Sequence, residues 1–157
     1  MTALKSLFFL ILVPGLFVGY IPFAFLMDGS YIETGFLTYL ALPLWVIGGF
    51  MVLGCFWSFL IKGKGTPAPI DPPKELVITG LYNFTRNPMY VGVLAMLISY
   101  FLWFGYWDIL LYTACFFIAF HIFIIAYEEP TLKRKFGGDY EDYLERVPRW
   151  LPKRRGR

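Results

Sequence analysis

Four long apolar stretches dominate this chain, and each is close to the length of a membrane-spanning helix. They run from Ser6 to Met27, from Phe36 to Ile61, from Met89 to Phe104 and from Trp107 to Tyr127. A helix needs about 20 residues to cross a hydrocarbon layer about 30 Å thick. Charged residues make up only 16% of the chain, against about 25% in soluble proteins. The sequence therefore predicts an all-α integral membrane protein with four transmembrane helices.

The cations are confined to three places in the chain. All 14 Lys and Arg residues lie at Lys5, in the loop 62–88, or in the tail 128–157. The other two turns contain acidic residues and no cation. Because cytoplasmic loops are enriched in Lys and Arg, we expect both termini and the loop 62–88 in the cytoplasm. Residues 1–157 then form a single domain in an inner or plasma membrane.

The net charge of +3 does not indicate nucleic-acid binding, because the cations flank the membrane and alternate with acidic residues. Their expected partner is the lipid bilayer, through its anionic headgroups. Cys55 and Cys115 lie in apolar stretches without a CxxC spacing, so the sequence predicts no metal site. Nothing in the sequence indicates an oligomeric state.

The cytoplasmic tail contains a predicted amphipathic helix. Four of its residues follow helical spacing and share one face: Tyr140, Tyr143, Leu144 and Val147. Such a helix can lie flat in the headgroup layer. It can also fold back over the end of the helix bundle as a lid, and the sequence leaves both arrangements open.

Ionisable residues near the membrane are costly to retain and mark candidate sites. Arg86 precedes the third stretch, and Glu128 and Glu129 close the fourth. Because these stretches form a hairpin, we expect the three charges at one level. They can form an ion pair that holds the hairpin closed. They can also bind a zwitterion, with Arg86 receiving a carboxylate and a glutamate receiving an ammonium or hydroxyl groups. The two interpretations are compatible.

His121 lies seven residues before Glu128, so both side chains project from nearly the same face of a helix. It is either a structural histidine or part of the site. Tyrosines near the charges are either interfacial anchors or rings that stack on a purine or face a sulfonium cation. These tyrosines are Tyr82, Tyr90, Tyr140 and Tyr143.

Two ordered motifs flank the hairpin. The first reads Gly80-x-Tyr82-x-x-x-Arg86-Asn87-Pro88-x-Tyr90-x-Gly92. The second reads Glu128-Glu129-Pro130-x-Leu132-x-x-x-Phe136-Gly137-x-x-Tyr140-x-x-Tyr143-x-x-x-Val147-Pro148-Arg149. Together they resemble the superfamily of isoprenylcysteine carboxyl methyltransferases and phospholipid methyltransferases. The resemblance covers about the C-terminal half of the chain.

This resemblance implies a membrane enzyme that uses S-adenosylmethionine, with the cofactor held between the hairpin and the tail. By position, one wall of the site consists of Tyr82, Arg86, Asn87, Pro88 and Tyr90. Glu128 and Glu129 form its membrane end. The lid consists of Tyr140, Tyr143, Arg146 and Pro148. We assign Glu128, Glu129 and Arg146 to catalysis, and the remaining residues together with His121 to cofactor binding.

The expected reaction is methyl transfer to a lipid-like, prenylated or carboxylate acceptor at the cytoplasmic face. Asn87 stands where methyltransferases of prenylated proteins usually have His, which counts against a prenylcysteine. An amine acceptor needs a base, for which Glu128 or Glu129 is the candidate. Two other functions remain open. One is an NADPH-dependent membrane reductase of the sterol reductase type, and the other is a non-catalytic membrane module in which the charges only lock the hairpin.

Overall fold

The computed structural model of the chain describes residues 12, 14–59, 61 and 75–151. All the regular elements of these residues are helices, and an isolated antiparallel bridge joins Tyr31 to Tyr106. Labels with α denote α-helices, and labels with η denote 3₁₀ or π segments. In chain order they are η1 (Gly15–Tyr20), α2 (Ile21–Phe25), η2 (Gly35–Leu40), α3 (Ala41–Ser58), η4 (Gly80–Asn83), α4 (Pro88–Phe104), α5 (Trp107–Phe123), η5 (Ile124–Glu128), α6 (Glu129–Phe136) and α7 (Gly138–Arg146). The all-α prediction is confirmed for these residues.

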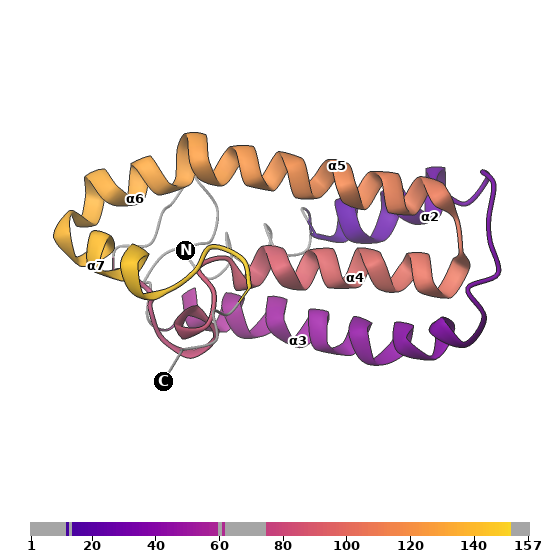
Figure 1. Cartoon of the computed structure of the whole chain (residues 1–157), viewed down its shortest axis with the longest axis horizontal. Coiled ribbons are helices and arrows are strands. Elements are labelled where there is room, and N and C mark those ends of the chain that lie inside the picture. The colour runs from indigo at the N-terminus through magenta and orange to yellow at the C-terminus, as the bar shows by residue number, and fades with distance from the viewer. Residues whose placement is uncertain (1–11, 13, 60, 62–74, 152–157) are drawn as a thin grey trace.

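Helix α4 packs between α3 and α5, and the three lie along the long axis of the molecule (Figure 1). Two glycines bring α3 and α4 together. A Cβ on Gly92 would lie 2.8 Å from the carbonyl oxygen of Gly48, and a Cβ on Gly48 would lie 2.7 Å from that of Gly92. Small residues let membrane helices approach closely, so this glycine pair sets the spacing of α3 and α4.

The turn before α3 and the turn between α4 and α5 lie against each other at one end of the molecule. The amide of Ile32 donates to the carbonyl of Gly105 over 3.0 Å, and the amide of Trp107 donates to that of Ser30 over 3.2 Å. Gly105 ends α4 with a φ of 76°, a conformation that favours glycine. These are the two turns without cations. Helices α6 and α7 lie at the opposite end (Figure 1).

Helix α5 does not end at Tyr127, where the sequence predicted the end of the fourth span. The helical conformation continues through η5 and α6 to Phe136. Pro130 lacks an N–H group, and its ring clashes with the carbonyl four residues earlier in a regular α-helix. The π segment η5 ends at Glu128, two residues before Pro130, and widens the helix there. Gly137, with a φ of 55°, then turns the chain into α7.

Two helices of the described residues are long and apolar enough to cross a membrane. They are Gly35–Ser58, with a mean hydropathy of 2.0, and Trp107–Phe136, with 2.4. The helical segments Gly15–Phe25 and Pro88–Phe104 are apolar but shorter. The prediction of four transmembrane helices is therefore supported only in part.

Other predicted boundaries change little. The third span begins at Pro88 rather than Met89, because the fixed φ of proline suits the first turn of a helix. The predicted first and second spans include residues 6–11, 13 and 60, which lie outside the described part of the chain. Most of the predicted loop, residues 62–74, lies outside it as well.

Candidate functional site

A cavity of about 130 Å³ lies where the segment before α4 meets the tail. Its walls come from Phe59 near the end of α3, from the segment 76–90, from the helix 123–132, and from α7. Apolar and aromatic side chains form most of the lining. Eight of the residues predicted for the site also line the cavity: Tyr82, Arg86, Asn87, Tyr90, Glu128, Glu129, Tyr140 and Tyr143.

Glu129 is the centre of an ion-pair network at this cavity. Its Oε1 accepts hydrogen bonds from Arg86 Nη1 over 3.0 Å and from Arg149 Nε over 2.8 Å. Its Oε2 accepts a third hydrogen bond from Arg149 Nη2 over 2.9 Å. The side chains of Arg86 and Glu129 are only 13% and 17% exposed. The ion pair predicted between Arg86 and the glutamates is therefore present, with Arg149 as a second cation.

Arg86 keeps one donor unused. Among the described residues, its Nε is the one buried side-chain nitrogen or oxygen without a hydrogen-bond partner. A buried donor that lacks an acceptor costs about 1–3 kcal/mol. Arg86 also lines the cavity.

Glu128 differs from its neighbour in its partners. The hydroxyl of Tyr90 donates to its Oε2 over 3.0 Å. No ion pair of Glu128 occurs within the described ranges of the chain. The ring of Tyr90 lies 4.5 Å from that of Phe120, which holds the hydroxyl in place. Glu128 is thus a carboxylate that faces the cavity without a cation, whereas Glu129 is committed to two arginines.

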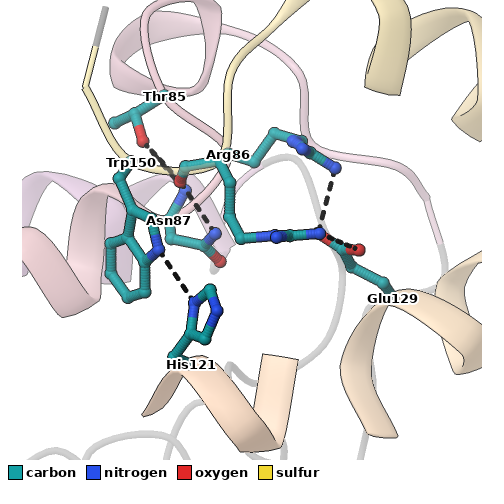
Figure 2. A network of polar contacts seen from close by, with 7 residues as sticks. Thr85, Arg86, Asn87, His121, Glu129 and Trp150 are labelled. Atoms are coloured by element: carbon teal, nitrogen blue, oxygen red, sulfur yellow. Dashed lines mark hydrogen bonds and ion pairs between the residues drawn. The ribbon is translucent and has the colours of Figure 1, made fainter. Parts of the chain in front are cut away.

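Residues 147–150 follow α7 and form what we call the C-terminal strap. The amide of Arg86 donates to the carbonyl of Pro148 over 2.9 Å. The carbonyl of Arg149 accepts from Thr85 Oγ1 over 3.0 Å and from Asn87 Nδ2 over 2.9 Å (Figure 2). The strap therefore binds the first motif through its main chain and Glu129 through the Arg149 side chain.

Two tyrosines of α7 complete the cavity wall. Burial raises the pKa of Tyr140 to about 12, and the nearby charge of Glu129 adds to the effect while Arg86 opposes it. Burial also raises the pKa of Tyr143, whose hydroxyl donates to the carbonyl of Tyr82 over 2.8 Å. Both phenols are therefore protonated near neutral pH and do not act as bases there. Tyr140 and Tyr143 place α7 at the wall of the cavity.

Residues 36–139 match the phospholipid methyltransferase family, which covers both walls of the cavity as far as α7. The chain belongs to this family. Membership supports methyltransferase activity, and together with the apolar helices it identifies an integral membrane protein. The resemblance inferred from the two motifs is therefore confirmed.

Two relatives of this family member show how far the likeness extends. The chain is 26% identical over 148 residues to Delta(14)-sterol reductase LBR of Gallus gallus. The aligned region covers 82% of this chain but only 23% of the reductase. The chain is also 38% identical over 63 residues to an uncharacterized protein of Haemophilus influenzae, and this aligned region covers 40% of the chain and 100% of that protein. No solved structure matches the chain.

Four residues predicted for the site of this phospholipid methyltransferase family member do not line the cavity: Pro88, His121, Arg146 and Pro148. Pro88 is buried at the start of α4, and Pro148 contributes its carbonyl to Arg86. Arg146 is exposed, and its Nε donates to the carbonyl of Asp142 within α7. The structure thus separates Arg146 from the two glutamates. Arg149, three residues further along, stands beside Glu129 instead.

His121 is also separated from the cavity. Its Nδ1 accepts a hydrogen bond from Trp150 Nε1 over 3.2 Å. The spacing of seven residues predicted one face for His121 and Glu128, but the π segment η5 lies between them and changes the register. Of these two residues, Glu128 lines the cavity and His121 does not, and their sharing of one helix face stays a prediction.

Sequence reasoning missed several residues of the site. Arg149 stands at the end of the second motif, in Val147-Pro148-Arg149, and its place in that motif was the available signal. Phe59, Met89 and Phe123 line the cavity as well, but such residues are common in apolar spans and gave no signal. Among the described residues, no group of three or more His, Cys, Asp or Glu lies together as metal ligands would.

Proposed function

We propose that this protein transfers a methyl group from S-adenosylmethionine to a lipid-like acceptor, with the cofactor bound in the cavity. The observation that supports this most directly is the largely apolar cavity that Arg86, Glu128 and several tyrosines line. A cation suits a ligand carboxylate. Membership of the phospholipid methyltransferase family points to the same class of reaction.

The residues present fit the chemical groups of this cofactor. Arg86 provides a cation for its carboxylate, and Glu128 provides a carboxylate without an ion-pair partner among the described residues for its ammonium. Tyr82, Tyr140 and Tyr143 provide rings that can stack on an adenine or face a sulfonium. The cofactor, when bound, supplies a methyl group on a sulfonium sulfur.

The two glutamates take different roles in this proposal. Glu129 accepts three hydrogen bonds from two arginines, so it holds Arg86 and the strap in place. Glu128 accepts one hydrogen bond from Tyr90 and is the better candidate for a base. An amine acceptor requires such a base, whereas a carboxylate acceptor does not. The apolar lining excludes water from the transfer and aligns the two reactants.

The membrane arrangement belongs to the same proposal. We place four spans in an inner or plasma membrane, with both termini and the cavity on the cytoplasmic side, as the distribution of cations indicates. The shorter segment Pro88–Phe104 then crosses as the third span, with tilting or local thinning of the bilayer to match its length. A soluble cofactor reaches the cavity from the cytoplasm and a lipid-like acceptor reaches it from the bilayer.

Equilibrium binding of S-adenosylhomocysteine to the full chain in detergent tests this function. We expect saturable binding by the wild type and a loss of at least tenfold in affinity for Arg86→Gln, since a charge-assisted contact contributes about 1.5–3 kcal/mol. Arg146→Gln is the matched control, because it removes the same charge from an exposed position. A folded wild type with no affinity for S-adenosylhomocysteine would overturn the proposal.

A reductase is the second candidate, since the chain resembles part of a Delta(14)-sterol reductase. That relative is much longer, and this chain spans 23% of it. Binding of NADPH in the same assay, with none of S-adenosylhomocysteine, would favour the reductase. Binding of neither, with a stable fold, would favour a non-catalytic module in which Arg86, Glu129 and Arg149 only lock the hairpin.

A further inference from the structure

Trp150 ends the C-terminal strap in an aromatic contact on α5. Its indole Nε1 donates to His121 Nδ1 over 3.2 Å (Figure 2). Its ring lies 5.0 Å from that of Phe117 and 6.1 Å from that of His121. Phe117 and His121 stack on each other at 6.0 Å with an interplanar angle of 16°. The Trp150 side chain thus contacts Phe117 and His121, which lie one helical turn apart on the same face of α5.

The two side-chain contacts that tie the strap to the helix Trp107–Phe136 differ in strength. Arg149 forms charge-assisted hydrogen bonds with Glu129. Trp150 forms a single neutral hydrogen bond and ring contacts eight residues earlier on the same helix, about 12 Å away. A neutral hydrogen bond contributes less than a charged one. The hydrogen bond of Trp150 is therefore the weaker of the two side-chain ties.

The strap helps to hold helix α7 in position, together with the hydrogen bond from the Tyr143 hydroxyl to the carbonyl of Tyr82. Tyr140 and Tyr143 of α7 form the tail side of the cavity. The chain enters α7 through the Gly137 break and leaves it through the strap. A ligand enclosed by this wall can leave when α7 moves away. Since the strap contacts restrain α7, they affect how often the wall opens.

We infer that the contact between Trp150 and His121 is a latch that holds α7 against the cavity and sets the residence time of a bound ligand. This inference deepens the proposed function and rests on it for the identity of the ligand. Both residues are positioning residues, because neither lines the cavity. The indole nitrogen only donates, so the latch requires an unprotonated Nδ1 on His121.

The test uses the full chain in detergent and two substitutions. Trp150→Phe keeps a ring against Phe117 but removes the N–H donor, and His121→Phe keeps a ring but removes the acceptor. Trp45→Phe is the matched control, since it removes an indole hydrogen bond to Tyr100 elsewhere in the bundle.

The first measurement is hydrogen exchange of the ligand-free protein. The amide of Arg86 donates to the carbonyl of Pro148, so its protection reports whether the strap is closed. We expect exchange at Arg86 and in α7 to rise about fivefold in both latch variants, the factor that corresponds to one net hydrogen bond. The double variant should equal either single variant, because both remove the same bond.

The second measurement is the dissociation rate of S-adenosylhomocysteine, which should rise by a similar factor in both latch variants and stay at the wild-type value in Trp45→Phe. Unchanged exchange in both variants, an equal rise throughout α3 and α4, or additive effects in the double variant would each overturn the latch. If the wild type binds no S-adenosylhomocysteine, the proposed function fails, and the exchange measurement still decides the latch.

Discussion

Replacing Glu129 with Gln tests the ion-pair network directly, because this one carboxylate serves two arginines. The substitution keeps the shape and one acceptor oxygen but removes the charge. Arg86, only 13% exposed, then loses its counter-ion, and a buried pair broken in this way costs about 3–5 kcal/mol. Arg149 is 30% exposed, so its share is about 0.2–1 kcal/mol because water screens it.

With the acceptor oxygen retained, we expect a loss near the lower end, about 3 kcal/mol. This is a large part of the stability of a typical domain, about 5–15 kcal/mol. Each kcal/mol shifts the Tm of a chain of this size by about 2–4 °C. The Glu129→Gln variant should therefore unfold about 10 °C below the wild type when followed by thermal denaturation in detergent.

Glu128→Gln is the matched control, because it changes the neighbouring carboxylate and leaves both arginines paired. Its one hydrogen bond, from Tyr90, predicts a change of about 1 kcal/mol or less. The reasoning is refuted if the two variants unfold at the same temperature. It is also refuted if high salt lowers the wild-type Tm as much as the substitution does, since salt screens exposed pairs far more than buried ones.

Further outcomes follow from packing and from ionisation. Gly92→Ala should destabilise the bundle by about 1–3 kcal/mol, because its Cβ would meet the carbonyl oxygen of Gly48. Gly49→Ala is the control and should be neutral, because its Cβ meets nothing within 4 Å. Equal Tm values for the two variants would contradict the close contact between α3 and α4. The pKa of Tyr140 is raised by burial to about 12 from an ordinary value of about 10, so the folded state holds this proton more firmly. The stabilisation that Tyr140 contributes to tail packing is complete below pH 10 and is lost as the pH rises through 12. Protease sensitivity of the tail across this range checks this, and Tyr140→Phe should depend less on pH than the wild type, with the buried Tyr143 still titrating.

The sequence predicted the helical class and the meeting of the two motifs, because both depend on the length and order of the apolar stretches. Apolar length identifies helices in a membrane, and a hairpin must return Glu129 to the level of Arg86. The pairing of these residues was therefore predictable before the partner geometry was known. The different partners of Glu128 and Glu129 were not predictable, since they depend on the position of Arg149 in the tail.

Two other features were not predictable from spacing. The face shared by His121 and Glu128 assumed a regular α-helix, and the π segment before Pro130 breaks that assumption. Arg146 and Arg149 carry the same charge in the same tail, and only the end of α7 decides which one turns toward the glutamates. Apolar cavity residues such as Phe59 resemble the lipid-facing residues around them, so composition does not separate the two.

The unbroken helix from Trp107 to Phe136 has a consequence for the host membrane. The part from Trp107 to Glu128 is about 30 Å long, which matches an ordinary hydrocarbon layer. A rigid helix of fixed length holds the carboxylates at a set height above the far turn. In a thinner or thicker bilayer the helix tilts to relieve hydrophobic mismatch, and the cavity moves relative to the headgroups. If the acceptor is membrane-borne as proposed, we therefore expect the acyl-chain length of the surrounding lipid to control how well this cavity meets it.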